Sequence, residues 1–445
     1  MNDKLAKKIT EKVEEKRDEV IKLAQELVKI PSESPNEQEI QEYTAEKLEK
    51  MGLEVDKWEI DLDKLSNHPG YIPPQDYHMD YSGRPNLVGK LEEEGEGRSL
   101  ILMGHTDTVP VEKEEAWDHD PYGGEIDKDR IYGRGAVDMK GGVAANMIAI
   151  ETIKELGELK GDVMIANVIE EELGGNGALS FAQEGYEADA GIYSEPSGES
   201  FIAVSNRGAQ FFRITVPGRS VGIEERWNSP HAIKKAMKIF EAAEDHARMR
   251  RRKVKHLPSY DLYSFDLGEI EDPELRKKAE NFERNVSPLS ICKIEAGDWP
   301  STLPTECVME GSIECLPGED IHEVKKEFKE YIQKICSEDA WLKENPPEIE
   351  WFGLWAESSA IEKNSPIVKT VQKNAKKVGL SPIPVGSGGS DLRCLTKYAN
   401  TPSILYGPSG SSIHGVDEYL DIDSLIETSK VITLTVADWC GFIES

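Results

Sequence analysis

The sequence predicts an α/β catalytic domain that is interrupted by a smaller α+β domain. Short apolar strands alternate with amphipathic helices over the first 205 residues, which is typical of a sheet covered by helices. From about Asn206 the order becomes strand–helix–strand–strand–helix–strand, as in ferredoxin-like domains, and the first pattern returns after residue 353. A chain of 445 residues is also too long for one ordinary domain. We therefore expect a catalytic domain from residues 1–205 and 354–445 and an inserted domain from residues 206–353.

The composition is that of an acidic globular protein. Hydrophobic residues make up 38% of the chain, and 84 Asp and Glu against 53 Lys and Arg give a net charge of −31. This charge argues against nucleic acid and anionic membranes as partners, because both are themselves polyanions. The acidic residues are spread along the chain, as on a heavily solvated surface; an acidic binding face is the alternative.

The cysteines and the first residues favour a cytoplasmic location. The six cysteines form no Cys-x-x-Cys pair and none precedes Cys292, so reduced thiols are expected rather than disulfides or a cysteine-ligated zinc. Residues 1–20 alternate charges at helical spacing and lack the apolar stretch of a signal peptide. No run approaches the roughly 18 apolar residues that a membrane span needs.

The elements of the catalytic domain follow from hydrophobic periodicity and from residues that end helices. Pro31 closes the first amphipathic helix and Gly52 ends the second. The segment 68–84, rich in proline, tyrosine and glycine, is expected to be a loop. Helices are predicted at residues 18–29, 39–51, 143–156, 366–378 and 423–439, and strands at residues 53–60, 86–91, 99–103, 162–168, 191–196 and 402–406.

The inserted domain shows longer elements and a charged segment. A helix that begins with Ser229-Pro230 has a common helix start. Charged, irregular structure is expected from the end of this helix at Arg250 to about Ser287. Strands are predicted at residues 210–216, 289–296, 306–315 and 348–352, and helices at residues 229–250 and 319–336.

Several strands of the catalytic domain end at metal-type side chains. His105 and Asp107 follow one strand and face the same side of an extended chain. The carboxylate can hold one ring N–H of the histidine and leave the other nitrogen free for a metal. Asp138 lies in a glycine-rich passage before a helix, and Glu170–Glu172 and Glu195 end two further strands. Ligands bind at the carboxyl ends of strands in open α/β sheets, so the pattern indicates a metal site.

Each of these motifs has a plainer alternative. His105 could be a loop histidine paired with a carboxylate, and Glu170–Glu172 could be a solvated acidic turn. However, three successive carboxylates repel one another, and bound cations would relieve that repulsion. The glycine-rich passage at 133–142 could cradle a phosphate, but it lacks the spacing of a P-loop or a dinucleotide fingerprint.

Five segments in order resemble a known family. They are HTDTVP at 105–110, YGRGAVDMKGG at 132–142, EEELGGNGA at 170–178, SEPSG at 194–198 and HGVDEYLDIDSL at 414–425. Together they resemble the zinc aminoacylase and glutamate carboxypeptidase family, especially its acetylornithine deacetylase and succinyl-diaminopimelate desuccinylase branch. The resemblance covers nearly the whole chain. It implies a zinc-aminopeptidase-like mixed sheet flanked by helices, and an inserted lid domain through which the protein forms a homodimer.

The resemblance implies two zinc ions per chain. Asp138 would bridge them, His105 and Glu195 would complete one site, and Glu172 and His414 would complete the other. Imidazole and carboxylate ligands would also suit cobalt or manganese. The peptide bond after Asp138 would be cis, as is usual in the family, a strain found mainly at functional sites.

The implied reaction is hydrolysis of an amide bond in a small N-acylated amino acid or similar amine. Asp107 would orient His105, and Glu171 would be the general base that takes a proton from the attacking water and returns it to the leaving amine. A di- or aminopeptidase of the same family is one alternative. A non-catalytic metal-binding relative is another, although it would have no need of Glu171.

Two substrate-contacting features of the family are missing. The position of a histidine that helps to hold the oxyanion is Gly222, and the position of an arginine that binds a substrate carboxylate is Glu314. His231 could replace the missing histidine, although the simpler interpretation is that it lies beside a helix cap.

The glycine-rich segment before residue 394 offers replacement contacts to the substrate. Arg393, with Asp391 and Ser390, is the main candidate, and Arg207 and Arg226 are alternatives. For each arginine a surface ion pair is the plainer interpretation.

Overall fold

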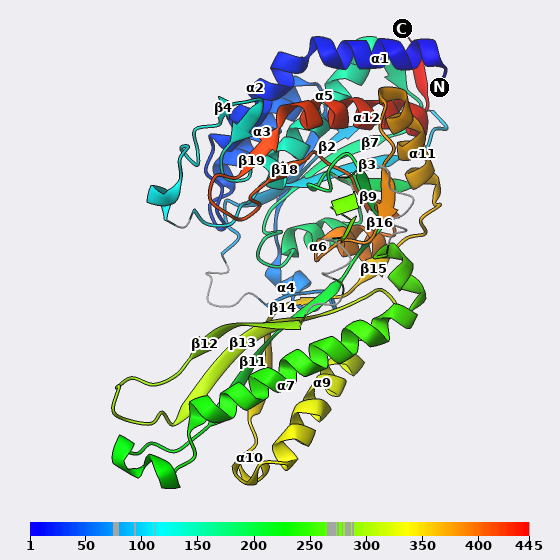
Figure 1. Cartoon of the computed structure of the whole chain (residues 1–445). Coiled ribbons are helices and arrows are strands. Elements are labelled where there is room, and N and C mark those ends of the chain that lie inside the picture. Colours follow the sequence, from blue (N-terminus) through cyan, green and yellow to red (C-terminus); the bar gives the residue numbers. More distant parts are fainter. Residues whose placement is uncertain are drawn as a thin grey trace. The chain divides into compact units, whose positions relative to one another are not determined.

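The computed structural model describes residues 1–73, 80–92, 95–111, 113–264, 273, 276–277, 279–280, 286 and 289–444. The chain forms two compact units (Figure 1). The first unit contains Met1–Tyr71, Asp76–Ser205 and Ser359–Ser445, and the second contains Ile72–Gln75 and Asn206–Ser358.

A mixed sheet of eight strands is the centre of the first unit. Its order is β1-β2-β7-β3-β8-β17-β9-β16. The strands are β1 (Glu54–Glu59), β2 (Pro85–Leu91), β7 (Val163–Val168), β3 (Leu100–His105), β8 (Ala190–Tyr193), β17 (Ser403–Leu405), β9 (Phe201–Ala203) and β16 (Ile383–Val385). Strand β3 is parallel to both β7 and β8, so the carboxyl ends of these three strands lie at the same edge. Every residue of β3 is buried, as expected for an apolar strand at the centre of a sheet.

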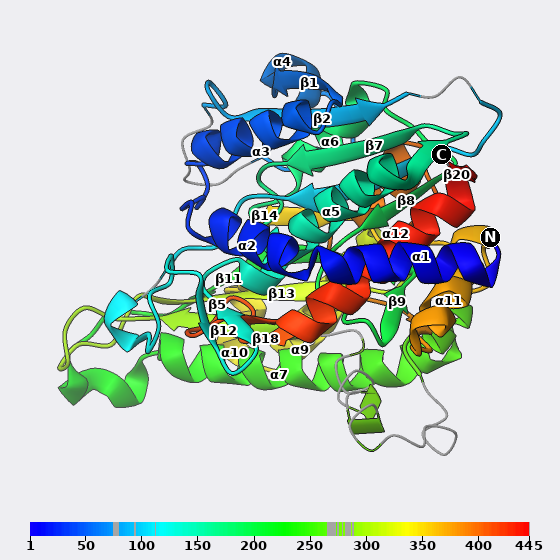
Figure 2. The same cartoon turned by 90° about the horizontal axis from the view of Figure 1, so that it is seen from above.

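Helices flank this sheet, as the sequence predicts. Figure 2 shows α1, α5 and α12 lying side by side over one face, and α6 lies on the other face (Figure 1). The helices are α1 (Asp3–Glu15), α2 (Arg17–Val28), α3 (Gln38–Lys50), α4 (Leu62–Leu65), α5 (Gly141–Leu156), α6 (Asn176–Gln183), α11 (Pro366–Ala375) and α12 (Ile422–Cys440). Helix α5 is buried along nearly its whole length, because it is apolar on all sides.

A small second sheet joins two loops of the first unit. It contains β18 (Gly410–Ser411), β19 (Tyr419–Asp421), β5 (Arg130–Tyr132) and β4 (Glu125–Asp127), in that order. Pairing of β19 with β5 places Leu420 opposite Ile131. The loop between β18 and β19 is thereby held beside the turn that leaves β5. A further pair, β6 (Gly157–Leu159) with β20 (Phe442–Glu444), lies at the end of α5.

The second unit has the predicted ferredoxin-like order. Its antiparallel sheet runs β12-β13-β11-β14. Along the chain the elements are β11 (Gly208–Pro217), α7 (Ala232–Lys253), β12 (Leu289–Glu295), β13 (Glu306–Cys315), α9 (Ile321–Ser337), α10 (Ala340–Glu344) and β14 (Glu348–Ala356). Phe212, Ile239 and Phe328 join the sheet and the two long helices in one buried core.

Some element boundaries differ from the prediction by three or more residues, including the end of β8 at Tyr193 rather than residue 196 and the end of α7 at Lys253 rather than residue 250. Helix α7 begins at Ala232 rather than Ser229, because His231 keeps an extended backbone with φ −95° and ψ 108°. Strand β14 continues to Ala356 rather than Phe352, because it pairs with β11 as far as Ala209. Most of the charged segment before Ser287 lies outside the described residues. No helix in the described part of the chain is long and apolar enough to cross a bilayer.

Candidate metal centre

Asp138 lies between two histidines from distant parts of the chain. Its Oδ1 is 3.3 Å from His105 Nε2, and its Oδ2 is 3.2 Å from His414 Nε2. His105 ends β3, Asp138 lies in the turn between β5 and α5, and His414 lies between β18 and β19. The Asp138–Met139 peptide bond is cis, as the family resemblance implies. Each carboxylate oxygen of Asp138 therefore faces a different imidazole ring.

Two glutamates complete this arrangement. Glu195 Oε1 is 3.6 Å from His105 Nε2, and Glu172 Oε2 is 2.9 Å from His414 Nε2. The ligand atoms of His105, Asp138 and Glu195 all lie within 4.8 Å of one another, as do those of Asp138, Glu172 and His414. Imidazole nitrogens with carboxylate oxygens form a donor set that suits zinc and similar divalent ions. The five side chains therefore fit two metal ions that share Asp138.

The buried carboxylates of this cluster depend on the two histidines for positive charge. Burial raises the pKa of Glu195 well above its ordinary value, although His105 opposes the shift. Burial opposes ionisation of Asp138 too, but hydrogen bonds with His105 and His414 hold its pKa below the ordinary value. Hydrogen bonds with Asp138 and Glu172 raise the pKa of His414 to about 10. Bound cations would satisfy the same carboxylates.

Asp107 holds the turn that follows β7. Its Oδ1 accepts a hydrogen bond from the backbone N–H of Glu171, and its Oδ2 accepts one from the backbone N–H of Glu172, each at 3.1 Å. The ring Nδ1 of His105 lies 3.0 Å from the backbone oxygen of Asp107 and 3.5 Å from its Oδ1. The main-chain oxygen is thus the nearer partner of the histidine, and the carboxylate chiefly positions the two glutamates.

Asp391 and Arg393 support the same turn from a neighbouring segment. A Cβ atom on Gly175 would lie 1.8 Å from Asp391 Oδ1, and Gly175 has a φ of +79°, so this close approach requires glycine. Arg393 is 1% exposed and donates a hydrogen bond to the carbonyl oxygen of Gly174 at 3.0 Å. Burial and the charge of Asp391 raise the pKa of Glu171 well above its ordinary value. Ser390, partly buried, directly precedes this pair.

The other substrate-binding candidates belong to the second unit. Arg207 forms an ion pair with Glu314 at 2.7 Å. Arg226 donates a hydrogen bond to the carbonyl oxygen of Ile223 at 2.8 Å. His231 directly precedes α7 but makes no capping hydrogen bond with its side chain. Gly222, at the position of the missing family histidine, pairs with Thr302 in an isolated β-bridge.

Glu418 is a supporting residue that the sequence reasoning missed. Its two buried oxygens accept four hydrogen bonds, from Arg134 Nη1 at 2.7 Å, Gly135 N at 3.1 Å, Val137 N at 3.2 Å and Asp138 N at 3.2 Å. Glu418 therefore anchors the turn that carries Asp138 to the loop that carries His414. The sequence contains a hint of this role, because Glu418 follows the proposed ligand His414 by four residues. Only the β5–β19 pairing, however, brings Glu418 to Asp138.

The model of peptidase family M20/M25/M40 matches residues 101–438 of the chain. The chain belongs to this family. Members of the M20/M25/M40 family hydrolyse amide or peptide bonds, so the expectation of a hydrolase that acts on linear amide or peptide bonds is confirmed.

Two curated M20 relatives match over nearly their whole length. The N-formyl-4-amino-5-aminomethyl-2-methylpyrimidine deformylase of Bacillus subtilis is 27% identical, with 97% of each chain covered. A probable succinyl-diaminopimelate desuccinylase of Staphylococcus aureus is 23% identical, and the match covers 92% of this chain and 94% of that protein. Among solved structures, the dipeptidase Dug1p of Saccharomyces cerevisiae has the same fold, with a TM-score of 0.76 at 16% identity over 99% of each chain.

Proposed function

We propose that this chain binds two divalent metal ions, zinc in the first instance, and hydrolyses the amide bond of a small N-acylated amine. The observation that carries this proposal is the position of Asp138, whose two oxygens face His105 at 3.3 Å and His414 at 3.2 Å. A carboxylate whose two oxygens face different histidines is suited to bridge two metal ions. Glu195 and Glu172 would each add one further ligand, and cobalt or manganese would suit the same donors.

Glu171 is the proposed general base. The bound metals would polarise the amide carbonyl and lower the pKa of the attacking water. In this proposal the carboxylate of Glu171 accepts the proton from that water, and the same carboxyl group then donates the proton to the leaving amine. Asp107 holds the backbone of Glu171 and so directs this side chain.

The names of two relatives and one ion pair of this chain indicate which class of N-acylated amine is the proposed substrate. The two curated relatives are named for the removal of formyl and succinyl groups from small amines. At the position that the family resemblance assigns to a carboxylate-binding arginine, Glu314 is instead neutralised by Arg207 at 2.7 Å. We therefore propose an N-acylated amine that needs no α-carboxylate, with an N-formylated heteroaromatic amine as the first candidate.

The test combines metal analysis with a substrate panel. Mass spectrometry of the purified protein should find two metal ions per chain. Release assays would cover N-formyl, N-acetyl and N-succinyl amines, with and without an α-carboxylate, and dipeptides; one acyl amine should be preferred. Turnover of dipeptides alone would favour a peptidase, and two metals without turnover would favour a non-catalytic relative. A chain that takes up no metal when zinc or cobalt is supplied would contradict the proposal.

We also propose that the second unit mediates a homodimer. Strand β12 is an edge strand of its sheet. Trp227, Trp299 and Met237 are 78%, 67% and 60% exposed, and such apolar exposure marks interaction surfaces. Hydrogen bonds from Ile223 N to Ser301 O and from Leu303 N to Val221 O join the two loops that carry the tryptophans.

Light scattering coupled to size exclusion tests this assembly. The wild-type chain should have the mass of a dimer, and the double variant W227S/W299S should have the mass of a monomer with an unchanged circular dichroism spectrum. A monomeric wild-type chain would contradict the proposal.

A cytoplasmic location is the final part of the proposed function, and it is supported by six cysteines that are all unpaired.

A further inference from the structure

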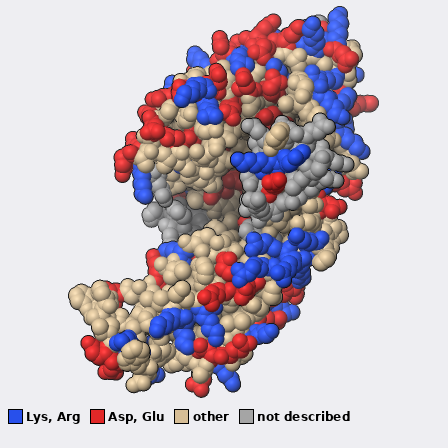
Figure 3. Space-filling model, in the orientation of Figure 1, with Lys and Arg blue, Asp and Glu red and all other residues tan. Residues whose placement is uncertain are grey.

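Glu170 is a buried acidic residue to which the proposed mechanism assigns no task. Figure 3 shows Asp and Glu side chains at many places on the visible surface of the protein, as expected for solvated acidic residues. Glu170, in contrast, is 3% exposed. It lies two residues after the end of β7 and directly precedes the proposed base Glu171. Neither group of described side chains that could hold a metal ion includes Glu170.

The backbone of Glu170 has a conformation that favours glycine. Its φ of +62° lies in the left-handed region, which glutamate rarely adopts. The carbonyl oxygen of Glu170 accepts a hydrogen bond from Gly175 N at 2.8 Å, so this residue closes the turn that carries Glu171 and Glu172. A strained residue of this kind persists only where its surroundings hold it firmly, and such residues cluster at functional sites. The contacts of the Glu170 side chain therefore need an explanation.

Three buried side chains hold the carboxyl group of Glu170. Asn176, at the start of α6, donates a hydrogen bond from Nδ2 to Glu170 Oε1 at 3.2 Å. The hydroxyl group of Tyr81 forms a second hydrogen bond with the same carboxyl group, and Arg84 Nη2 lies 3.9 Å from Glu170 Oε2. Polar contacts are stronger in such a buried place than in water. They fix the side chain of Glu170 and, through it, the backbone of this residue.

The same network extends to Asp107, which holds the proposed base from another side. Arg84 donates two hydrogen bonds to the buried carboxylate of Glu37, from Nε and Nη2, each at 2.7 Å. Ser34 Oγ donates a hydrogen bond to Glu37 Oε1 at 2.6 Å and lies 3.5 Å from Asp107 Oδ2. Asp107 Oδ1 accepts the hydrogen bond from Glu171 N. The proposed base is thus held both at its own N–H group and at the residue that precedes it.

We propose that Glu170 is a positioning residue that sets the direction of the Glu171 side chain. Its carboxyl group is anchored by Tyr81, Arg84 and Asn176, so the backbone from which Glu171 projects has one fixed course. A general base must lie within hydrogen-bond reach of the proton that it accepts, and a small displacement costs much of the rate. This inference rests on the proposed role of Glu171 as the base and adds the residue that directs it.

A double-mutant cycle in the full-length protein tests this role. The substrate is the acyl amine that the panel selects, with an N-formylated heteroaromatic amine as the first choice. Glu170→Gly removes the carboxyl group but suits the left-handed backbone, so the variant should fold. Its kcat should fall by about 10- to 100-fold, while KM and the content of two metal ions per chain stay as in wild type. In the background of Glu171→Gln, the same substitution should change kcat by less than about twofold, because Glu170 acts through Glu171.

Two further variants separate positioning from stability. Glu170→Gln keeps the length of the side chain and an oxygen that can accept the hydrogen bond from Asn176, so its kcat should be only about three- to tenfold below that of wild type. The same cycle with Glu170→Gln makes the test independent of the stability of the glycine variant. Asp129→Gly is the matched control, since Asp129 is exposed and also has a φ of +62°. It should have the kcat of wild type, and thermal unfolding compares the stability of all variants.

Three outcomes would overturn the inference. One is a wild-type kcat in Glu170→Gly. Another is an equal loss of kcat with and without the carboxylate of Glu171, since this would mean that Glu170 affects the protein independently of the base. The third is the loss of a metal ion from Glu170→Gly, which would place its effect on the ligand Glu172. Full activity of the single variant Glu171→Gln would instead contradict the proposed base, and this result does not involve Glu170.

Discussion

The carboxylate of Asp107 accepts a hydrogen bond from the backbone N–H of Glu171 at 3.1 Å, and its second oxygen holds the N–H of Glu172 at the same distance. One side chain thus fixes two neighbouring glutamates to which we assign different tasks. Asp107 follows His105 by two residues, and β3 and β7 are adjacent parallel strands. Asp107 therefore holds together the ends of these two strands, which carry the proposed base Glu171 and the proposed metal ligands His105 and Glu172.

Replacement of Asp107 by asparagine tests this relationship. An amide offers one acceptor oxygen instead of two, so one of the two backbone N–H groups loses its partner. We expect metal affinity and kcat/KM to fall by about 10- to 100-fold while the chain stays folded. Metal titration and steady-state kinetics measure both effects. The control is Asp189→Asn, because Asp189 accepts a backbone hydrogen bond from Ser99 at the opposite end of β3; an equal loss in the control would refute a specific role for Asp107.

Glu171→Gln should separate catalysis from metal binding. The amide cannot accept a proton from water, so kcat should fall by about 10²- to 10⁴-fold. Metal content should stay at two ions per chain, because Glu171 is not among the five proposed ligands. The comparison variant Glu172→Ala should lose one of the two ions. Full activity of Glu171→Gln would show that another group transfers the proton.

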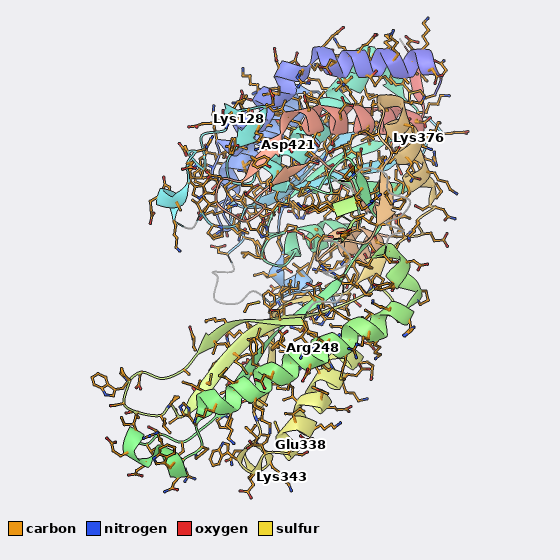
Figure 4. All side chains as sticks on the ribbon, viewed as in Figure 1. Lys128, Arg248, Glu338, Lys343, Lys376 and Asp421 are labelled. Atoms are coloured by element: carbon orange, nitrogen blue, oxygen red, sulfur yellow. The ribbon has the colours of Figure 1, made fainter. Side chains whose placement is uncertain are left out.

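Glu418→Gln should destabilise the turn that carries Asp138. The substitution leaves Arg134 buried without its charged partner, a change that costs about 3–5 kcal/mol in comparable buried pairs. Urea unfolding measures the loss. Asp421 (Figure 4) forms an ion pair with Arg130 at 3.4 Å, and both side chains are partly exposed. Asp421→Asn should therefore cost less than about 1 kcal/mol. Similar losses in the two variants would contradict the role assigned to Glu418.

The stability of the second unit should fall as the pH drops from neutral. His246 is 3% exposed and packs against Phe328 and Tyr331. Burial, together with Arg250 and Lys253, lowers its pKa from 6.5 to about 4, and Glu327 opposes the shift only in part. Below pH 6.5 the unfolded chain gains a proton that the folded chain refuses, so stability declines until about pH 4.

This shift corresponds to a loss of about 3 kcal/mol between those pH values. Urea unfolding of wild type and His246→Phe at pH 7, 5.5 and 4.5 isolates the effect, because all other titrating groups are shared. The difference in unfolding free energy between the two chains should change in favour of the variant as the pH falls. A difference that stays constant with pH would show that His246 does not titrate in this way.

Local patterns in the sequence predicted most elements of both units. The apolar run of β3 and the helical spacing of α5 are visible without any knowledge of the fold. The three-residue strands β9 and β16 were not predicted, because a segment so short has no readable period. The sequence predicts the start of α7 three residues too early, because Ser229-Pro230 resembles a helix start although His231 remains extended.

The sequence by itself determined the order of strands and helices, because strand ends and residue types can be read locally. Its family resemblance also named Asp138 and the four side chains that meet around it, together with their division into two groups. Only the tertiary structure decided that Glu418 anchors the turn of Asp138. It also decided that Arg393 is buried against Gly174 rather than exposed. The physical reason is the same in each case. These contacts join residues far apart in the chain, such as those brought together by the β5–β19 pairing, and no local pattern encodes them.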